Sequence, residues 1–200
     1  MKNIARLFSA VFRPSLYPLV GHAILFAFTY LRLLPWDFKL WVLSAVYVFT
    51  VALPYTLIFL TRKLNGWSKQ DMYQQHRRYM VYGINIICYV SCIYVFRNLN
   101  LPSFMEVILI VSLMVQCVCA LVNMWHKVSR HSAGTGLIIG ALLAYSHIFS
   151  FNPIWWLCIS ILLSGAVMSS RMMLNKNTLG QVMGGTGIGI ICGFVGIIMW

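Results

Sequence analysis

Acidic residues are almost absent from this sequence, which holds three Asp or Glu among 200 residues, against 15 Lys or Arg. They are Asp37, Asp71 and Glu106, so no acid follows position 106. This shortage argues against a two-carboxylate hydrolase, a Ser-His-Asp triad and a metal site built from His and carboxylates. A transporter of protons or cations that relies on buried acids also lacks its usual groups. We predict neither a metal nor a cofactor.

Charge of either sign is scarce as well, because charged residues make up 9% of the chain and apolar residues 60%, with a mean hydropathy of +0.81. A soluble domain carries about a quarter charged residues. The apolar runs are long enough for a bilayer core, which needs about 20 residues per helix. They lack the alternation of a barrel strand, so helices are favoured. The sequence predicts an all-α membrane bundle of six to seven spans that forms one domain over residues 1–200.

Seven apolar runs give the expected spans, at about 16–34, 40–60, 80–96, 105–125, 133–151, 154–170 and 179–199. Counting crossings places the N-terminus and the loops 61–79, 126–132 and 171–178 on one side of the membrane, which we call side A. Side A holds 12 Lys or Arg and the other side three. The positive-inside rule then makes side A cytoplasmic. We expect a multi-pass protein of the inner cell membrane that contacts lipids and binds no nucleic acid.

Two local features qualify this scheme. Pro54 lies inside the second span, where a proline removes a backbone hydrogen bond and can kink a helix. The last span is rich in glycine from Gly180 to Gly193, and small residues at this density favour close helix packing. These glycines follow no strand, so we do not interpret them as a dinucleotide-binding loop.

The side A loops gather basic and hydrogen-bonding residues and contain a single acid, Asp71. Their notable polar residues are Lys69, Arg77 and Arg78 in the first loop, Ser129, Arg130 and His131 in the second, and Arg171, Asn177 and Gln181 in the third. An even number of spans separates the loops, so all three can converge at one membrane face. Such a cluster suits an anion, and above all a phosphate.

The order and spacing of these residues resemble the type 2 phosphatidic acid phosphatase family, in its compact bacterial branch. The family's second motif is Pro-Ser-Gly-His, and here Val128-Ser129-Arg130-His131 keeps its Ser and His. The third motif is Ser-Arg, five residues, His, three residues, Asp. Here Ser170-Arg171, Asn177 and Gln181 stand at that spacing. A two-span hairpin separates the motifs, as in the family, so residues 1–60 become N-terminal helices and 61–200 a phosphatase-like core.

The resemblance implies roles for individual residues. Arg171 would bind phosphate, helped by Ser129 and the backbone amide near Arg130, and His131 would be the general acid that protonates the leaving group. The family's basic first motif would be represented by Lys69, Arg77 and Arg78. The spacing from Lys69 to Arg77 is one residue longer than in the family.

The main departure is Asn177, because the family has its nucleophilic His at this position. An amide is a poor nucleophile and cannot carry a phosphoryl group. Gln181 replaces the acid that orients this His. The two amides could instead line an anion pocket, and His126 is a further candidate for a relocated nucleophile. We therefore expect a phosphatase-like protein that binds a lipid-linked phosphate or pyrophosphate, with reduced or lost catalysis.

Two other classes stay open. One is a non-enzymatic scaffold that binds anionic lipid, with or without a partner protein. The other is a small carrier of phosphorylated lipids, although polar groups within the spans are few. The sequence also leaves open whether the chain forms homo-oligomers or joins another membrane protein.

Overall fold

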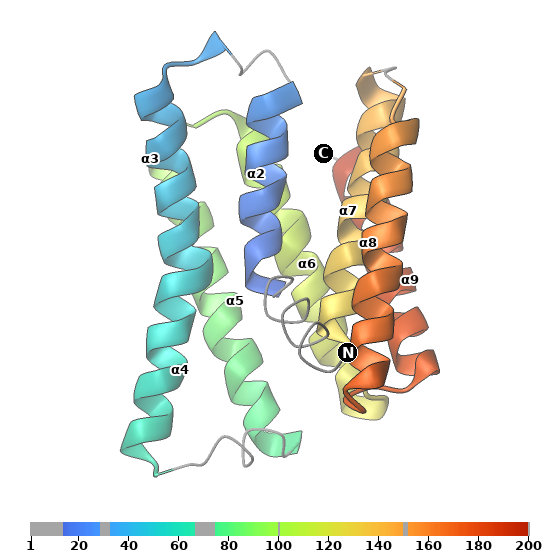
Figure 1. Cartoon of the computed structure of the whole chain (residues 1–200). Helices are drawn as coiled ribbons and strands as arrows, with labels where there is room; N and C mark the ends of the chain where they lie inside the picture. The colour runs from blue at the N-terminus through green and yellow to red at the C-terminus, as the bar shows by residue number, and fades with distance from the viewer. Residues whose placement is uncertain (1–13, 29–32, 67–74, 100, 150–151, 200) are drawn as a thin grey trace. The chain divides into compact units, whose positions relative to one another are not determined.

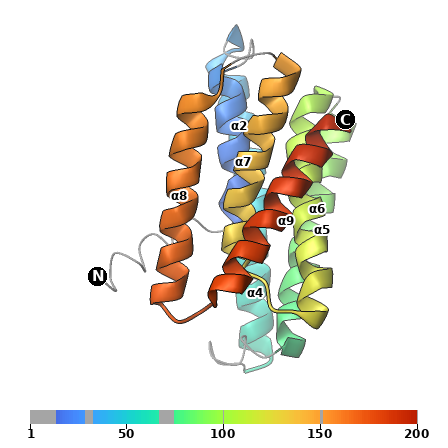
Figure 2. The same ribbon diagram turned by 90° about the vertical axis from the view of Figure 1, so that its right-hand side faces the viewer.

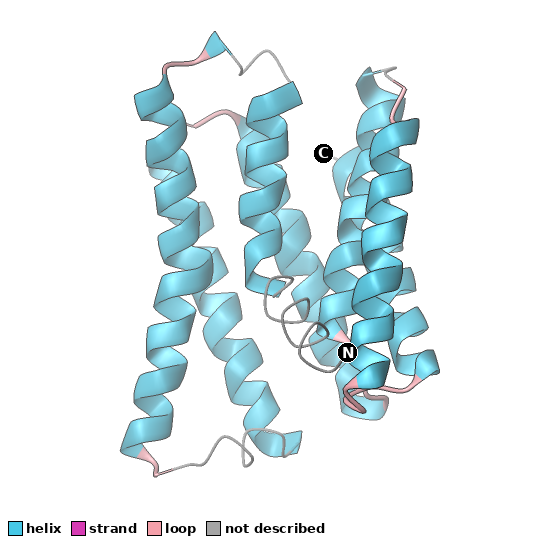
Figure 3. Cartoon of the chain, in the orientation of Figure 1, coloured by secondary structure: helices cyan, strands magenta, loops and turns pink. Residues whose placement is uncertain are grey.

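A computed structural model of the chain describes residues 14–28, 33–66, 75–99, 101–149 and 152–199. Helix occupies nearly all of these residues, and no strand occurs among them (Figures 1 and 3). The elements are η1 (Pro14–Leu16), α2 (Tyr17–Phe28), α3 (Trp36–Tyr47), η3 (Val48–Ala52), α4 (Leu53–Leu64), α5 (Gln75–Asn98), α6 (Ser103–Trp125), α7 (Arg130–Phe149), α8 (Ile154–Met173) and α9 (Leu179–Ile198). The prediction of an all-helical bundle is confirmed for the described residues.

Five helices are long and apolar enough to cross a membrane. They are Trp36–Leu64, Met80–Asn98, Ser103–Trp125, Ile154–Met173 and Leu179–Ile198. A shorter apolar helix, Tyr17–Phe26, lies where the first span is expected, and α7 lies where the fifth is expected. The chain is therefore a multi-pass membrane protein by the length and composition of its helices.

Exposed tryptophans stand at the ends of these spans. Trp36 begins α3 and is 76% exposed, Trp155 is the second residue of α8, and Trp125 ends α6. Tryptophan is enriched at membrane–water interfaces, where its ring sits at the level of the lipid headgroups. Their positions agree with the limits that the apolar runs give to the spans.

The second span absorbs Pro54 through a π-helical turn. Proline has no amide hydrogen, so the carbonyl four residues earlier loses its usual helical partner. The turn η3 ends at Ala52, two residues before the proline, and the Leu53 amide donates to the carbonyl of Val48, five residues back. The buried hydroxyl of Thr50 donates to the carbonyl of Val46 at 2.8 Å. The helix thus continues as one span from Trp36 to Leu64.

The chain divides into two compact units, which we describe separately. Unit 1 comprises residues 1–17 and 110–200, and unit 2 comprises residues 18–109. The prediction of one membrane domain over residues 1–200 stays a prediction. All three acids of the sequence belong to unit 2, and unit 1 contains no Asp or Glu.

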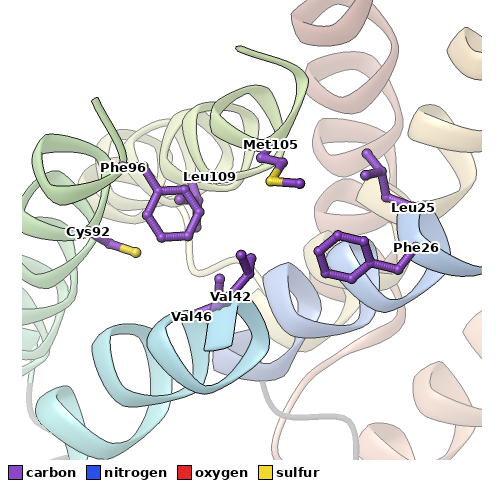
Figure 4. Close-up of a cluster of buried hydrophobic side chains, with 8 residues drawn as sticks. All are labelled: Leu25, Phe26, Val42, Val46, Cys92, Phe96, Met105 and Leu109. Carbon is purple, nitrogen blue, oxygen red and sulfur yellow. The ribbon is translucent and has the colours of Figure 1, made fainter. Parts of the chain in front are cut away.

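Unit 2 has a core of buried apolar side chains from α2, α3, α5 and α6 (Figure 4). Its buried members are Leu25, Phe26, Val42, Val46, Cys92, Phe96, Met105 and Leu109. Three pairs, Val42 with Val46, Cys92 with Phe96 and Met105 with Leu109, are spaced four residues apart, so each lies on one face of its helix. Two ionisable groups beside this core have protein partners. His22 hydrogen-bonds to the carbonyl of Pro18 at 2.8 Å, and Glu106 accepts from Arg97 at 3.2 Å.

Unit 1 is organised by the close packing of α7 against α9 (Figure 2). Gly185, Gly189 and Gly193 recur every fourth residue and place one face of α9 on the backbone of α7. A Cβ on Gly185 would lie 2.6 Å from the carbonyl oxygen of Ser129, and one on Gly193 would lie 2.7 Å from that of Leu137. The structure thus agrees with the expected packing role for these glycines.

This packing also fixes the direction of the two helices. Contacts advance together along both chains, from Gly185 with Ser129 to Gly193 with Leu137, so α7 and α9 run parallel. Gly136 and Gly140 on α7 make the same close approach to the backbone of α9. The two helices therefore begin at the same end of unit 1, where α8 ends. The loops between α6 and α7 and between α8 and α9 lie together there (Figures 1 and 2).

Candidate functional site

Helix α8 ends in a Schellman motif, and Arg171 lies in the last turn of this helix. The amide of Lys176 donates to the carbonyl of Arg171 at 3.2 Å, and the amide of Asn175 donates to that of Met172 at 2.9 Å. Asn175 takes the left-handed conformation that this motif requires, with φ of 50°. Asparagine reaches this region more readily than most residues. The motif turns the chain from α8 toward α9 with defined geometry.

The start of α9 is fixed by a capping box. Thr178 is the N-cap, and its amide donates to Oε1 of Gln181 at 3.2 Å. This bond supplies a partner to an amide at a helix start, where the backbone has none of its own. Asn177 lies between the Schellman motif and the capping box, so both neighbours along the chain are held in place.

Arg171, Asn177 and Gln181 form a continuous row of hydrogen bonds. Nε and Nη2 of Arg171 both donate to Oδ1 of Asn177, at 3.2 and 3.0 Å. Nδ2 of Asn177 then donates to Oε1 of Gln181 at 3.3 Å. Arginine and the backbone amide of Thr178 can only donate, so each end of the row requires an amide oxygen. This requirement fixes which way both side-chain amides are turned.

The segment around Ser129 joins this row through the backbone. The amide of Ser129 donates to the carbonyl of Gln181 at 3.1 Å, and the ammonium of Lys127 donates to the carbonyl of Lys176 at 3.0 Å. The Ser129 side chain is buried and accepts from the hydroxyl of Ser132 at 3.0 Å. The structure therefore brings together the segment around Ser129 and the segment from Arg171 to Gln181.

Arg130 and His131 are the first two residues of α7, and both are partly buried. The carbonyl of His131 accepts from the hydroxyl of Tyr17 at 3.0 Å. The Tyr17 ring lies against Gly134, where a Cβ would overlap it. Tyr17 thus supports the first turn of α7. That the His131 imidazole faces Arg171 stays a prediction.

The basic residues that we expect to represent the family's first motif are not placed relative to this site. Lys69 lies outside the described residues. Arg77 and Arg78 belong to the first turn of α5 in unit 2, and their side chains also lie outside the described part. Their contribution to phosphate binding remains a prediction.

The chemistry of unit 1 favours an anion. Two helix N-termini, those of α7 and α9, meet the last turn of α8, and each N-terminus carries about half a positive charge. Lys127, Arg130, Arg171 and Lys176 add full charges near these termini, and unit 1 has no Asp or Glu to offset them. Among the described residues, no three His, Cys, Asp or Glu gather in a way that could hold a metal ion. The site can hold an oxyanion through charge-assisted hydrogen bonds.

Hydroxyl groups below the site tie α8 to its neighbours, which the sequence reasoning missed. Thr135 on α7 and Ser164 on α8 are hydrogen-bonded at 3.1 Å, and both are buried. Thr186 on α9 lies 3.7 Å from the sulfur of Met168 on α8. Hydroxyls that recur on one face of an apolar helix, as at Ser160 and Ser164, are the signal that could have indicated this contact.

Comparison with models of protein families, with curated proteins and with solved structures finds no match for this chain. Membership of the phosphatase family therefore stays a prediction from the order and spacing of the motifs around Ser129, Arg171 and Gln181.

Proposed function

We propose that this chain is a phosphatidic acid phosphatase-like membrane protein that binds a lipid-linked phosphate or pyrophosphate at the bilayer interface. The observation that supports it most is the row Arg171–Asn177–Gln181, joined to Ser129 by the bond between the Ser129 amide and the Gln181 carbonyl. This row is at the end of unit 1 where two helices begin, which suits an anion. By the positive-inside rule, this end faces the cytoplasm, and the protein lies in the inner cell membrane.

Reduced or absent catalysis follows from Asn177. Its side chain lies between Arg171 and Gln181, as a nucleophilic His would have to lie between the phosphate-binding group and the orienting group. An amide in this position can hold the row together, but it cannot form a phosphoryl-enzyme intermediate. His131 as general acid would then have no covalent step to assist. The proposal is therefore a binding protein built on a phosphatase-like site.

A non-enzymatic partner or scaffold protein is the alternative, and the same row favours it. All of its acceptors are neutral oxygens already engaged by protein donors. A scaffold needs to bind anionic lipid but does not need to hydrolyse it, so it requires no nucleophile at position 177. Recognition of anionic lipid is common to both candidates, and hydrolysis above background would identify the first.

Lipid binding is tested with the whole protein in nanodiscs of phosphatidylcholine, with and without a minor fraction of phosphatidic acid. We expect retention of phosphatidic acid by the unmodified protein and its loss in Arg171→Ala, because charge-assisted hydrogen bonds contribute about 1.5–3 kcal/mol each. Arg62→Ala is the matched control, since it removes a cation from the last turn of α4. An equal loss in both variants would mean general surface attraction and would contradict the proposal.

Turnover is measured on the same samples as phosphate release. We expect hydrolysis well below ordinary enzyme rates of about one per second. Asn177→His is expected to raise it, because Gln181 can accept a hydrogen bond from the new ring. Rapid turnover by the unmodified protein would refute the assignment of lost catalysis, and its loss in His126→Ala would then identify a relocated nucleophile.

A further inference from the structure

Helix α8 presents a face of small hydroxyl side chains to the rest of unit 1. Its buried residues are serines with one exception: Ser160, Ser164, Val167 and Ser170. Its large apolar residues, such as Trp155 and Leu162, are exposed instead. Helices lock together when the side-chain ridges of one fill the grooves of the other, and serines make shallow ridges. Shape alone therefore holds the rotation of α8 weakly.

The pairing of α7 with α9 is of the opposite kind. A Cβ on Gly185 or on Gly193 would lie 2.6 or 2.7 Å from a carbonyl oxygen of α7. Contact at this distance between two backbones leaves little freedom for either helix to slide or turn. The N-termini of α7 and α9 are thus fixed relative to one another, whereas Arg171 is carried by α8.

Hydroxyl contacts below the site connect α8 with both of these helices. Ser164 on α8 is hydrogen-bonded to Thr135 on α7 at 3.1 Å. Thr135 uses its one hydroxyl proton on the carbonyl of Ser132, at 2.9 Å, so Ser164 is the donor in the interhelical bond. The sulfur of Met168, a weaker acceptor, lies 3.8 Å from the Ser164 hydroxyl and 3.7 Å from that of Thr186 on α9.

Ser164 and Arg171 lie on the same face of α8. They are seven residues apart, which is close to two helical turns and about 10 Å along the axis. The loops at the ends of α8 fix where the helix begins and ends, but they leave its rotation about its own axis to side-chain contacts. A contact that holds Ser164 against α7 therefore also sets the direction in which Arg171 leaves the helix.

We propose that Ser164 and Thr135 are positioning residues, whose interhelical hydrogen bond fixes the rotation of α8 and so directs Arg171 toward the starts of α7 and α9. This inference rests on the proposed function in taking Arg171 as the group that binds the lipid phosphate. Without the bond, α8 populates other rotations, and the affinity falls by the fraction of molecules in which Arg171 is in place. The strength of interhelical hydroxyl bonds in membranes sets this fall at about threefold to tenfold.

The first test measures retention of phosphatidic acid by the whole protein in phosphatidylcholine nanodiscs, with Ser164→Ala as the variant. This change leaves no donor without a partner, because Thr135 keeps its bond to Ser132. Ser160→Ala is the matched control, since it removes a buried serine of the same face whose hydroxyl donates to Leu157 within α8 at 3.0 Å. We expect the affinity to fall by about threefold to tenfold in Ser164→Ala and to stay unchanged in Ser160→Ala. Equal affinities of the two variants would overturn the inference.

The partner residue shows whether the hydroxyl or the packing matters. Thr135→Val keeps the shape of the side chain and removes the hydroxyl, whereas Thr135→Ser keeps the hydroxyl. We expect the valine variant to lose as much affinity as Ser164→Ala and the serine variant to bind like the unmodified protein. Thr135→Val combined with Ser164→Ala should bind as well as either single variant, because each breaks the same bond. A loss in Thr135→Ser as large as that in Thr135→Val would count against the inference.

A signal from the arginine itself separates positioning from a general loss of stability. In protein made with isotope-labelled arginine, the Nε–H resonance of Arg171 is identified by its absence in Arg171→Ala. We expect this resonance to move in Ser164→Ala and to stay in place in Ser160→Ala, because the Nε donates to Asn177 and depends on the direction of the side chain. An unmoved resonance in Ser164→Ala would overturn the inference even if the affinity falls.

The resonance also keeps this inference distinct from the proposed function, because it is recorded without ligand. If the unmodified protein does not retain phosphatidic acid, the proposed function fails, and the resonance still decides whether Ser164 positions Arg171. If the protein retains the lipid and Ser164→Ala changes neither the affinity nor the resonance, the proposed function stands and the inference fails.

Discussion

Replacing Gly189 with alanine is expected to disrupt the pairing of α7 with α9. A Cβ at this position would overlap the carbonyl oxygen of Ala133 and lie 2.8 Å from the amide nitrogen of Leu137. Both atoms belong to the backbone of α7, so no rotation of a side chain relieves the overlap. The two helices must move apart along an interface that three glycines of α9 bring close.

The expected loss of stability is judged by comparing two glycines of the same helix. Forcing extra volume into a packed interface costs about 1–3 kcal/mol, and we expect Gly189→Ala to fall near the upper end because only backbone can yield. Gly184 is the control, since it is exposed and a Cβ there would meet no atom within 4 Å. Gly184→Ala should leave stability unchanged or raise it by up to about 1 kcal/mol, as alanine favours the helix.

The measurement is reversible unfolding of both variants in detergent, followed by circular dichroism and tryptophan fluorescence. A gap of about 3 kcal/mol between them corresponds to roughly a hundredfold difference in the unfolding equilibrium. The Gly189 variant should also bind phosphatidic acid more weakly, because the Ser129–Gln181 bond depends on the same interface. Equal stability of the two variants would refute the tight parallel packing.

Two further predictions concern the loop and the orientation of the chain. Asn175→Gly should preserve stability and lipid binding, whereas Asn175→Val should cost about 1–2 kcal/mol, because φ of 50° penalises a β-branched residue; equal unfolding midpoints in detergent would contradict this. Two reporters are fused in turn after Trp200, one that functions only outside the cytoplasm and one that functions only inside it. The first should be active, because seven crossings from a cytoplasmic N-terminus end outside. Activity of the second reporter alone would reverse the orientation.

The positions of the spans could be predicted from the sequence because they depend on continuous apolar runs. The runs at 105–125 and 179–199 became α6, Ser103–Trp125, and α9, Leu179–Ile198, with ends shifted by no more than two residues. The response to Pro54 was less predictable. The freed backbone can be accommodated by a kink, by water or by a π turn, and the choice depends on neighbours such as Thr50 and Val46.

The candidate site was predictable in composition and less so in its contacts. Residue spacing identified Arg171, Asn177 and Gln181 as a group, because it matches the third motif of the family that the sequence resembles. It did not show that Asn177 joins the other two or that its oxygen faces Arg171. That arrangement depends on the Schellman motif at Asn175 and on the capping box between Thr178 and Gln181.

The side chain at position 177 bears on both phosphate binding and catalysis in the proposed function. Parallel packing brings the N-termini of α7 and α9 to the end of α8, so partial positive charges meet Arg171 in a unit that has no Asp or Glu. An acceptor oxygen relieves this concentration of donors, and Asn177 supplies it when no ligand is bound. A neutral histidine there would replace the amide oxygen with a ring nitrogen that has a lone pair. The exchange would place a nucleophile beside Arg171, so Asn177→His should raise hydrolysis, measured as phosphate release.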